Sequence, residues 1–180
     1  MKVAITGHSR HIGKALTELF TSQGHSVVGF SRSNGYDISN SQSVANIIKQ
    51  STDCDVFVNN ACSGFHQNNV FEEIFAVWQN ETSKTIVNIS SRAKYWAAPS
   101  ADLKTYYMSK KQLNHSAYKK MYQKNRCKVI TINPGYVSDN PGDSDKPTIT
   151  TTQLAETIKW CLNQPPGVEI GELSVWQLGF

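Results

Sequence analysis

Short apolar runs alternate with amphipathic segments along almost the whole chain, and this alternation limits the folds open to it. Runs with the length and composition of buried strands fall at 2–6, 26–31, 55–61, 84–90, 128–135 and 172–178. Segments with the helical spacing of apolar residues fall at 12–24, 41–50, 70–80, 104–124 and 151–163. Strands that alternate with helices form a parallel sheet with helices on both faces. The sequence therefore predicts an α/β fold with a doubly wound parallel sheet, a three-layer αβα sandwich, in one domain of residues 1–180.

Composition excludes several classes of protein. Hydrophobic residues make up 39% of the 180 residues and charged residues 18%, which suits a packed core and not a disordered chain. The formal net charge is +4 and no block of like charges occurs, so no nucleic acid is expected as a partner. No apolar run is long enough to span a bilayer, so no membrane partner is expected either.

Cysteine and histidine patterns give no sign of a metal site. The four cysteines form no CxxC pair, and the five histidines share no ligand spacing, so neither a metal nor a structural disulfide is expected. The opening residues MKVAITG run straight into a strand pattern and lack the features of a signal peptide. Together these observations predict a cytoplasmic location.

A glycine-bearing loop joins the first predicted strand to the first predicted helix. In AITGHSRHIGKAL, Gly7 permits a tight turn off the strand and Gly13 permits close packing of the helix on the sheet. The helix that follows would present free N–H groups to an anion. In an open α/β sheet this location binds the pyrophosphate of a dinucleotide, so the loop indicates a Rossmann-type nucleotide-binding fold.

The stretch KTYYMSKK, residues 104–111, holds two Tyr–Lys pairs at helical spacing. Tyr106 and Lys110 stand i, i+4 apart, as do Tyr107 and Lys111, so each pair would stack on one helix face. A lysine so placed can lower the pKa of a neighbouring phenol and make it a proton donor or acceptor. Adjacent helix residues point about 100° apart, so only one pair can face a given site.

Several motifs in chain order resemble those of the short-chain dehydrogenase/reductase family, and the resemblance covers nearly the whole chain. Thr6, Gly7 and Gly13 match its TGxxxGxG pattern, with His11 in place of the middle glycine. The other matching stretches are YDIS (36–39), NNAC (59–62), IVNISS (86–91), YYMSK (106–110) and NPGYVSD (133–139). Cys62 stands where the family has glycine, and Asp139 where threonine is common.

The resemblance implies a set of catalytic residues. The family form YxxSK selects Tyr106 as general acid and base and Lys110 as its partner, because Ser109 precedes Lys110. The family serine that polarises the carbonyl is Ser91 or Ser90, and we favour Ser91, the second of the two. For a further asparagine, Asn68 and Asn69 are candidates and we favour Asn69; an N-cap role is equally compatible with either.

The resemblance also implies a nicotinamide cofactor. The residues expected to bind it are Gly7, Ser9, Arg10, His11, Ile12, Gly13, Arg32, Asp37, Ile38, Asn60, Ala61, Tyr106, Lys110, Pro134, Gly135 and Val137. No acidic residue ends the second predicted strand, where NAD-dependent relatives have one, and Arg10 and Arg32 are placed to meet a 2′-phosphate. We therefore expect NADP(H) in preference to NAD(H).

These implications add up to an NADP(H)-dependent oxidoreductase that interconverts a small-molecule carbonyl and an alcohol. One alternative is a non-catalytic nucleotide-binding or redox-sensing protein, which His11, Cys62 and the short segment after NNAC would favour. Another is a nucleotide-sugar epimerase or dehydratase, whose TGxxGxxG pattern would need glycine where Arg10 stands. Family members commonly form homodimers or homotetramers.

The substrate pocket is expected beside the polar loop 136–150. Aromatic side chains near the predicted strand ends could line it, and the candidates are Phe65, Tyr95, Trp96 and Tyr136.

Overall fold

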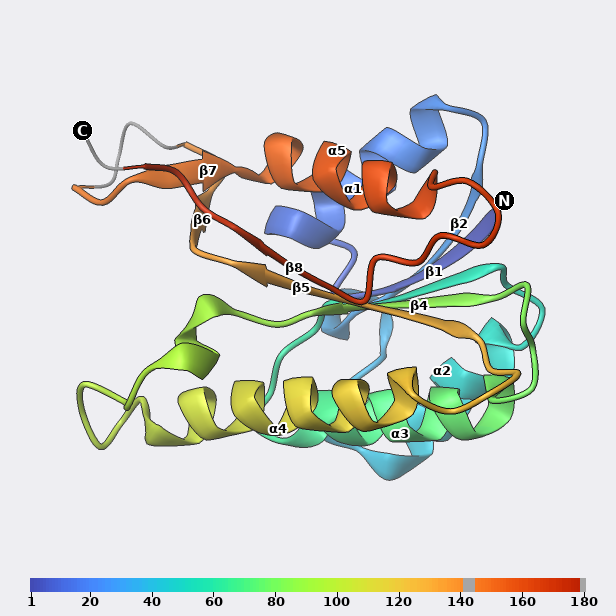
Figure 1. The fold of residues 1–180 in the computed structure, drawn as a ribbon, viewed down its shortest axis with the longest axis horizontal. Coiled ribbons are helices and arrows are strands. Elements are labelled where there is room, and N and C mark those ends of the chain that lie inside the picture. Colours follow the sequence, from blue (N-terminus) through green and yellow to red (C-terminus); the bar gives the residue numbers. More distant parts are fainter. Residues whose placement is uncertain (141–144, 179–180) are drawn as a thin grey trace.

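A computed structural model describes residues 1–140 and 145–178. Within these residues six parallel strands form one sheet in the order β2-β1-β3-β4-β5-β8 (Figure 1). The strands are β1 (Lys2–Thr6), β2 (Ser26–Phe30), β3 (Val56–Asn59), β4 (Thr85–Ile89), β5 (Lys128–Pro134) and β8 (Glu172–Val175). The predicted doubly wound parallel sheet is confirmed.

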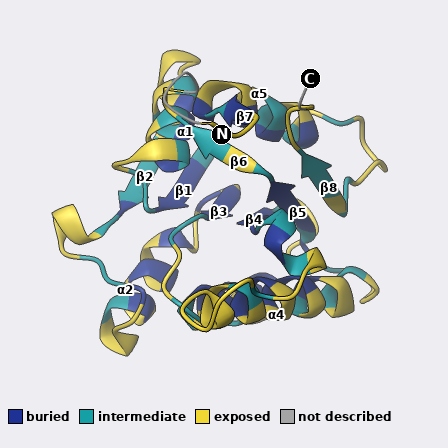
Figure 2. Ribbon diagram, turned by 90° about the vertical axis from the view of Figure 1, so that its left-hand side faces the viewer, coloured by how far each residue is buried: buried dark blue, intermediate teal, exposed yellow. Residues whose placement is uncertain are grey.

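Helices cover both faces of the sheet. On one face lie α1 (His11–Ser22) and α5 (Thr151–Leu162), and on the other lie α2 (Ser41–Ser51), α3 (His66–Trp78) and α4 (Lys104–Met121) (Figure 1). Side chains alternate along β1, so Ala4 packs toward α2–α4 while Val3 and Ile5 pack toward α1 and α5. The two resulting apolar clusters lie between the three layers, where the ribbon is buried (Figure 2).

Four short elements lie outside the strands and helices that the apolar pattern predicts. They are the 3₁₀ turns η1 (Arg32–Asn34) and η2 (Arg92–Tyr95) and the strands β6 (Tyr136–Ser138) and β7 (Thr148–Thr150), which pair in parallel. Helix α3 also begins four residues before the predicted position 70, at His66. Residues 141–144 of the predicted pocket loop lie outside the described residues.

The order of the strands sets the place of a binding site. The chain moves from β1 to β2 on one side and then returns to β3 on the other side of β1. The loops after β1 and β3 therefore diverge at the carboxyl ends of these strands and leave a crevice between them. In open α/β sheets ligands bind at such a switch point.

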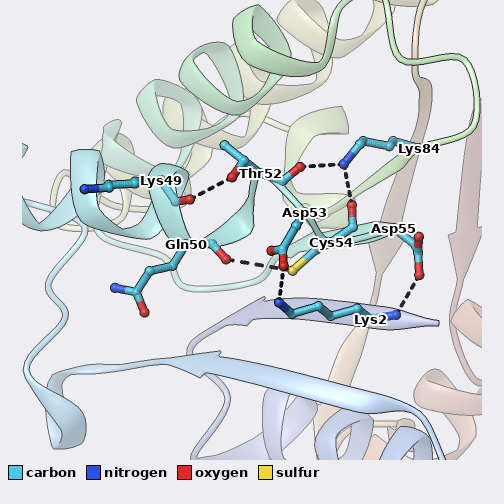
Figure 3. Close-up of polar contacts among 8 residues, drawn as sticks. All are labelled: Lys2, Lys49, Gln50, Thr52, Asp53, Cys54, Asp55 and Lys84. Atoms are coloured by element: carbon cyan, nitrogen blue, oxygen red, sulfur yellow. Dashed lines mark hydrogen bonds and ion pairs between the residues drawn. The ribbon is translucent and has the colours of Figure 1, made fainter.

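At the amino ends of the strands, opposite the crevice, Lys2 and Lys84 connect neighbouring segments (Figure 3). Lys2 at the start of β1 bonds Asp53 through its ammonium, at 2.5 Å, and Asp55 through its backbone N–H, at 2.7 Å. Lys84, before β4, donates to the carbonyl oxygens of Thr52 and Cys54 at 2.6 and 2.8 Å. These contacts connect the amino ends of β1, β3 and β4, away from the crevice.

We expect the change Lys84→Met to lower the free energy of unfolding by about 1–3 kcal/mol. It removes the ammonium that donates both hydrogen bonds, so the carbonyl oxygens of Thr52 and Cys54 lose this partner. Urea unfolding measures this loss. The control Lys49→Met alters an exposed lysine on α2 and should leave the free energy almost unchanged. Equal stability of the two variants would show that the Lys84 contacts do not stabilise the fold.

Candidate active site

The crevice at the switch point is a cavity of about 640 Å³ formed by the loops after β1, β2 and β3. Most of the residues expected to hold a cofactor line it together. These are Gly7, Ser9, Arg10, His11, Ile12, Arg32, Asp37, Ile38, Asn60 and Ala61. The cavity continues to Cys62 and Ser63, next to the catalytic candidates described below.

The loop at the floor of this cavity leaves no room for larger residues. Gly7 has a φ of +70°, in the left-handed region. A Cβ on Gly13 would lie 2.1 Å from the carbonyl oxygen of Gly7, so only glycine fits there. Thr6 Oγ1 accepts hydrogen bonds from the backbone N–H groups of Asn60 and Ala61, both at 3.0 Å, which joins the loops after β1 and β3.

His11 takes the backbone conformation of the glycine that it replaces. Its φ is +45°, a left-handed value that is uncommon outside glycine. Its imidazole Nδ1 lies 2.8 Å from Asp139 Oδ2, and the side chain is 75% exposed at the edge of the cavity. Asp139 Oδ1 also accepts a hydrogen bond from Thr151, at 2.9 Å. The two residues that depart from the family pattern at these positions are thus in contact with each other.

The cavity carries more cationic than anionic groups. Arg10 and Arg32 both line it, and Asp37 is the acidic residue among its described lining. Hydrogen bonds from the backbone and hydroxyl of Ser39 to Oδ1 hold the pKa of Asp37 below its ordinary value. Helix α1 begins at this cavity, and no side chain caps its N-terminus. The first backbone N–H groups of the helix therefore face the cavity without a capping partner. This cradle fits the pyrophosphate of a dinucleotide.

Ser91 and Tyr106 lie together at a second cavity of about 650 Å³. Ser91 follows β4, and its hydrogen bond with Tyr106 lowers the pKa of the phenol. Burial raises this pKa more strongly, so the pKa of Tyr106 lies above its ordinary value. Ser90 points elsewhere, because it is buried and its Oγ accepts a 2.5 Å hydrogen bond from Asn114.

Lys110 is buried under Tyr106, with 3% of its surface exposed. Its ammonium donates to Gln67 Oε1 at 2.7 Å and to the Ile89 carbonyl at 3.1 Å, and it lies 5.5 Å from the centre of the Tyr106 ring. Burial lowers the pKa of Lys110. The sequence argument expected Lys110 to lower the pKa of Tyr106; in the structure burial raises the phenol pKa instead, and the Ser91 hydrogen bond opposes it only in part.

Gln67, and not the expected Asn69, is the residue of α3 that contacts Lys110. Asn69 is exposed on α3 and lines neither cavity. Gln67, two residues earlier, is buried, and its Nε2 donates to the carbonyls of Asn59 and Ile89 at 2.8 and 2.9 Å. Since α3 begins at His66 rather than at residue 70, its first turn faces the ends of β3 and β4. Phe65 at the N-cap of α3 makes no side-chain hydrogen bond, so the sequence carried no local signal for this earlier start.

Cys62 lies between the two cavities. Its thiol is exposed, while Cys54, Cys127 and Cys161 are buried. The electrostatic influence of Cys62 raises the pKa of Tyr106 and opposes the effect of burial on the pKa of Lys110, so the thiol is close to both.

The second cavity is lined mainly by aromatic and proline side chains. Of the residues expected there, Trp96 and Tyr136 line it, whereas Tyr95 hydrogen-bonds Ser174 at 3.0 Å and Phe65 lies outside. Pro134 and Gly135 belong to this cavity, while Val137 packs into the apolar cluster with α5. Tyr107 also lines the cavity, but its partner Lys111 is exposed. Sequence reasoning missed Arg92 and Trp176, which complete the wall.

Comparison with known proteins gives a family model and many similar folds. Residues 3–159 match the model of the NAD dependent epimerase/dehydratase family. Serine dehydrogenase from Escherichia coli superposes with a TM-score of 0.79 at 19% identity, over 98% of this chain and 97% of that chain. An alcohol dehydrogenase from the archaeon Thermococcus sibiricus, complexed with 5-hydroxy-NADP, gives 0.78 at 20% identity over 99% and 97%.

A short chain dehydrogenase from Burkholderia cenocepacia J2315, in complex with NADP, gives a TM-score of 0.80 at 18% identity, over 96% of this chain and 86% of that chain. No curated protein matches the chain by sequence.

Within the described part of the chain, none of the helices combines the length and the apolar character that crossing a bilayer requires. Those residues also hold no group of three His, Cys, Asp or Glu side chains arranged as a metal site.

We expect Lys110 to make stability depend on pH in a way that Lys110→Met removes. The unfolded chain holds the Lys110 proton more tightly than the folded chain, so the free energy of unfolding rises as pH increases toward the ordinary pKa of 10.5. Urea unfolding of both proteins between about pH 7 and about pH 10 should show their difference growing with pH in favour of the unmodified protein.

The buried thiols Cys127 and Cys161, whose pKa burial raises to about 11, act in the opposite direction. They are present in both proteins, so their effect cancels in the difference. A difference that is constant with pH would show that folding does not lower the pKa of Lys110.

Proposed function

Because the chain belongs to the NAD dependent epimerase/dehydratase family, a branch of the short-chain dehydrogenase/reductase superfamily, we propose that it is an NADP(H)-dependent oxidoreductase. In this proposal it transfers hydride between the cofactor and a small carbonyl or alcohol. The observation that supports it is the group of Ser91, Tyr106 and Lys110, which lies between a cradle for a dinucleotide and a second, largely apolar cavity.

The residues divide the chemistry among them. A bound nicotinamide supplies or accepts the hydride. Ser91 holds the carbonyl oxygen by hydrogen bonding, and Tyr106 gives its phenolic proton to that oxygen during reduction. The raised pKa of Tyr106 keeps the phenol protonated before the reaction. Lys110 stabilises the negative charge that develops on the phenol, and Gln67 positions the lysine.

The preference for NADP(H) is proposed from the charges of the first cavity. Arg32 follows the end of β2 and Arg10 precedes α1, and both line the cavity, where they would be available to an adenosine 2′-phosphate. Asp37 lies beyond η1 and not at the end of β2, where an NAD-selecting acid would stand, and its Oδ1 accepts both hydrogen bonds from Ser39.

The epimerase or dehydratase alternative has the family model in its favour. The backbone of the loop supports the dehydrogenase pattern, because the left-handed φ values, which favour glycine, occur at Gly7 and His11, the two positions where TGxxxG has glycine. Arg10, where the other pattern has glycine, is extended, with φ −143° and ψ 156°. An epimerase returns its hydride, so net oxidation of NADPH by a carbonyl distinguishes the two. The expected homodimer or homotetramer and the cytoplasmic location stay predictions.

We expect the double change Arg10→Gln with Arg32→Gln to weaken NADPH binding by at least about tenfold, because charged hydrogen bonds to the phosphate are lost. NADH affinity should change little, since NADH lacks that phosphate. Tryptophan fluorescence or calorimetric titration with each cofactor measures both constants. Lys124→Gln, which removes an exposed charge after α4, is the control. Equal losses for NADPH and NADH would contradict the assignment of the two arginines to the 2′-phosphate.

We expect Tyr106→Phe to lower kcat for carbonyl reduction by about 100-fold or more while NADPH still binds, because the proton donor is removed. Tyr107→Phe, the adjacent control, should alter kcat by no more than a few fold, since its lysine partner is exposed. Steady-state kinetics with NADPH checks both. Retained activity in Tyr106→Phe with loss in Tyr107→Phe would transfer the catalytic role to Tyr107, and NADPH binding without turnover of any carbonyl would favour the non-catalytic alternative.

A further inference from the structure

Arg92 introduces a positive charge into the second cavity, whose other lining residues are uncharged. It is the first residue of η2 and directly follows Ser91. Its guanidinium lies over two indole rings, with Cζ at 4.0 Å from the ring centre of Trp176 and at 5.1 Å from that of Trp96. Such cation–π contacts hold the group in place without using its N–H donors.

The guanidinium of Arg92 has no acceptor within residues 1–140 and 145–178. Its Nε is buried and makes no hydrogen bond, and no carboxylate of the described chain pairs with it. The Nε of Arg126 is also buried without a partner, but its Nη groups differ from those of Arg92, because they donate to Glu169 at 2.9 and 3.0 Å. A neighbouring cation, Lys94, is likewise paired, with Glu172. Arg92 as a whole is half-buried, but a buried donor such as its Nε normally has a partner, so this unpaired side chain is consistent with an acceptor supplied by a ligand.

The walls of the cavity define what that ligand can carry. Apart from Arg92, the described lining residues bear no formal charge, and Trp96, Tyr136 and Trp176 offer apolar surface. A planar guanidinium with free N–H groups matches a carboxylate, which accepts two parallel hydrogen bonds. One arginine balances one negative charge, so the lining favours a monoanion with an apolar body over a doubly charged phosphate ester.

We propose that the substrate is an oxo acid, or in the reverse direction a hydroxy acid, whose carboxylate binds Arg92 while its carbonyl lies at Ser91 and Tyr106. This assignment rests on the proposed oxidoreductase function. In reduction the carbonyl carbon gains a hydride from NADPH, the oxygen gains the Tyr106 proton, NADPH becomes NADP⁺ and the carboxylate is unchanged. Tyr106 recovers its proton from solvent, so atoms and charge balance.

A panel of 2-, 3- and 4-oxo acids and their methyl esters tests the proposal with NADPH. The unmodified protein should reduce at least one acid with a kcat/KM at least about tenfold above that of its ester, as expected for a charge-assisted pair. In Arg92→Met, which keeps a long apolar side chain over the indoles, this ratio should fall at least about tenfold. Arg92→Lys should restore part of it, and Lys104→Met, an exposed change at the start of α4, should leave it unaltered. Esters reduced as well as acids, or an unchanged ratio in Arg92→Met, would overturn the carboxylate site.

A binding measurement separates this proposal from the proposed function. Arg92 lies over Trp96 and Trp176, so a bound carboxylate should change tryptophan fluorescence. The probes are 3-phenylpropanoate and 3-phenylpropanamide, which cannot be reduced, titrated against the unmodified protein, Tyr106→Phe and Arg92→Met. The carboxylate should bind more tightly than the amide in the first two proteins, with the preference lost in Arg92→Met.

If this preference depends on Arg92 but no carbonyl in the panel is reduced, the oxidoreductase proposal fails and the carboxylate site stands. If carbonyls are reduced but neither the kinetics nor the binding prefers a carboxylate, the oxidoreductase proposal stands and the oxo-acid assignment is overturned.

Discussion

A buried ammonium group organises the candidate active site. Lys110 is almost fully enclosed; its ammonium donates to the Gln67 side chain and the Ile89 carbonyl and also interacts with the Cys62 thiol, and none of these is a carboxylate. Burying a charge without an opposite charge is costly, so its acceptors must be held firmly in place. Gln67 provides this because its amide also bonds the ends of β3 and β4. One lysine thus fixes α3, α4 and two strand ends relative to one another, and its cost suits a functional role better than a structural one.

How far the sequence predicts the structure depends on the range of the interactions involved. The strands and the order of strands and helices along the chain follow from local periodicity, and the structure agrees with them. The choice of Tyr106 and Lys110 over Tyr107 and Lys111 came instead from the family form YxxSK, and the Lys110 ammonium lies 5.5 Å from the centre of the Tyr106 ring. Gln67 was missed because α3 begins without a side-chain cap at Phe65, so no local signal marks its first turn. Arg92 was missed because its contact with Trp176 joins residues that are far apart in the sequence, and no local pattern indicates it.

The departures from the family's motifs change the contacts of the cleft while its backbone geometry is kept. His11 adopts a left-handed φ, so the loop retains the path that glycine would give it, at a steric cost of roughly 1–2 kcal/mol. The contact between His11 and Asp139 joins the loop after β1 to the segment after β6. A chain that had lost its ligand would have no reason to keep a strained backbone at this position. The substitution therefore gives less support to a degenerate site than the sequence alone suggested.

The distribution of charge along the two cavities is consistent with anionic ligands at both ends. Arg10 and Arg32 line the first cavity, Lys110 lies between the cavities, and Arg92 lines the second. The neighbouring acids are already engaged, since Asp37 accepts from Ser39, Asp139 contacts His11 and Glu172 pairs with Lys94. Cations left without carboxylate partners create a positive potential that draws in anions and holds them at fixed points. A dinucleotide and a carboxylate substrate would each neutralise a different part of this potential, so that neither ligand competes with the other for the same cation.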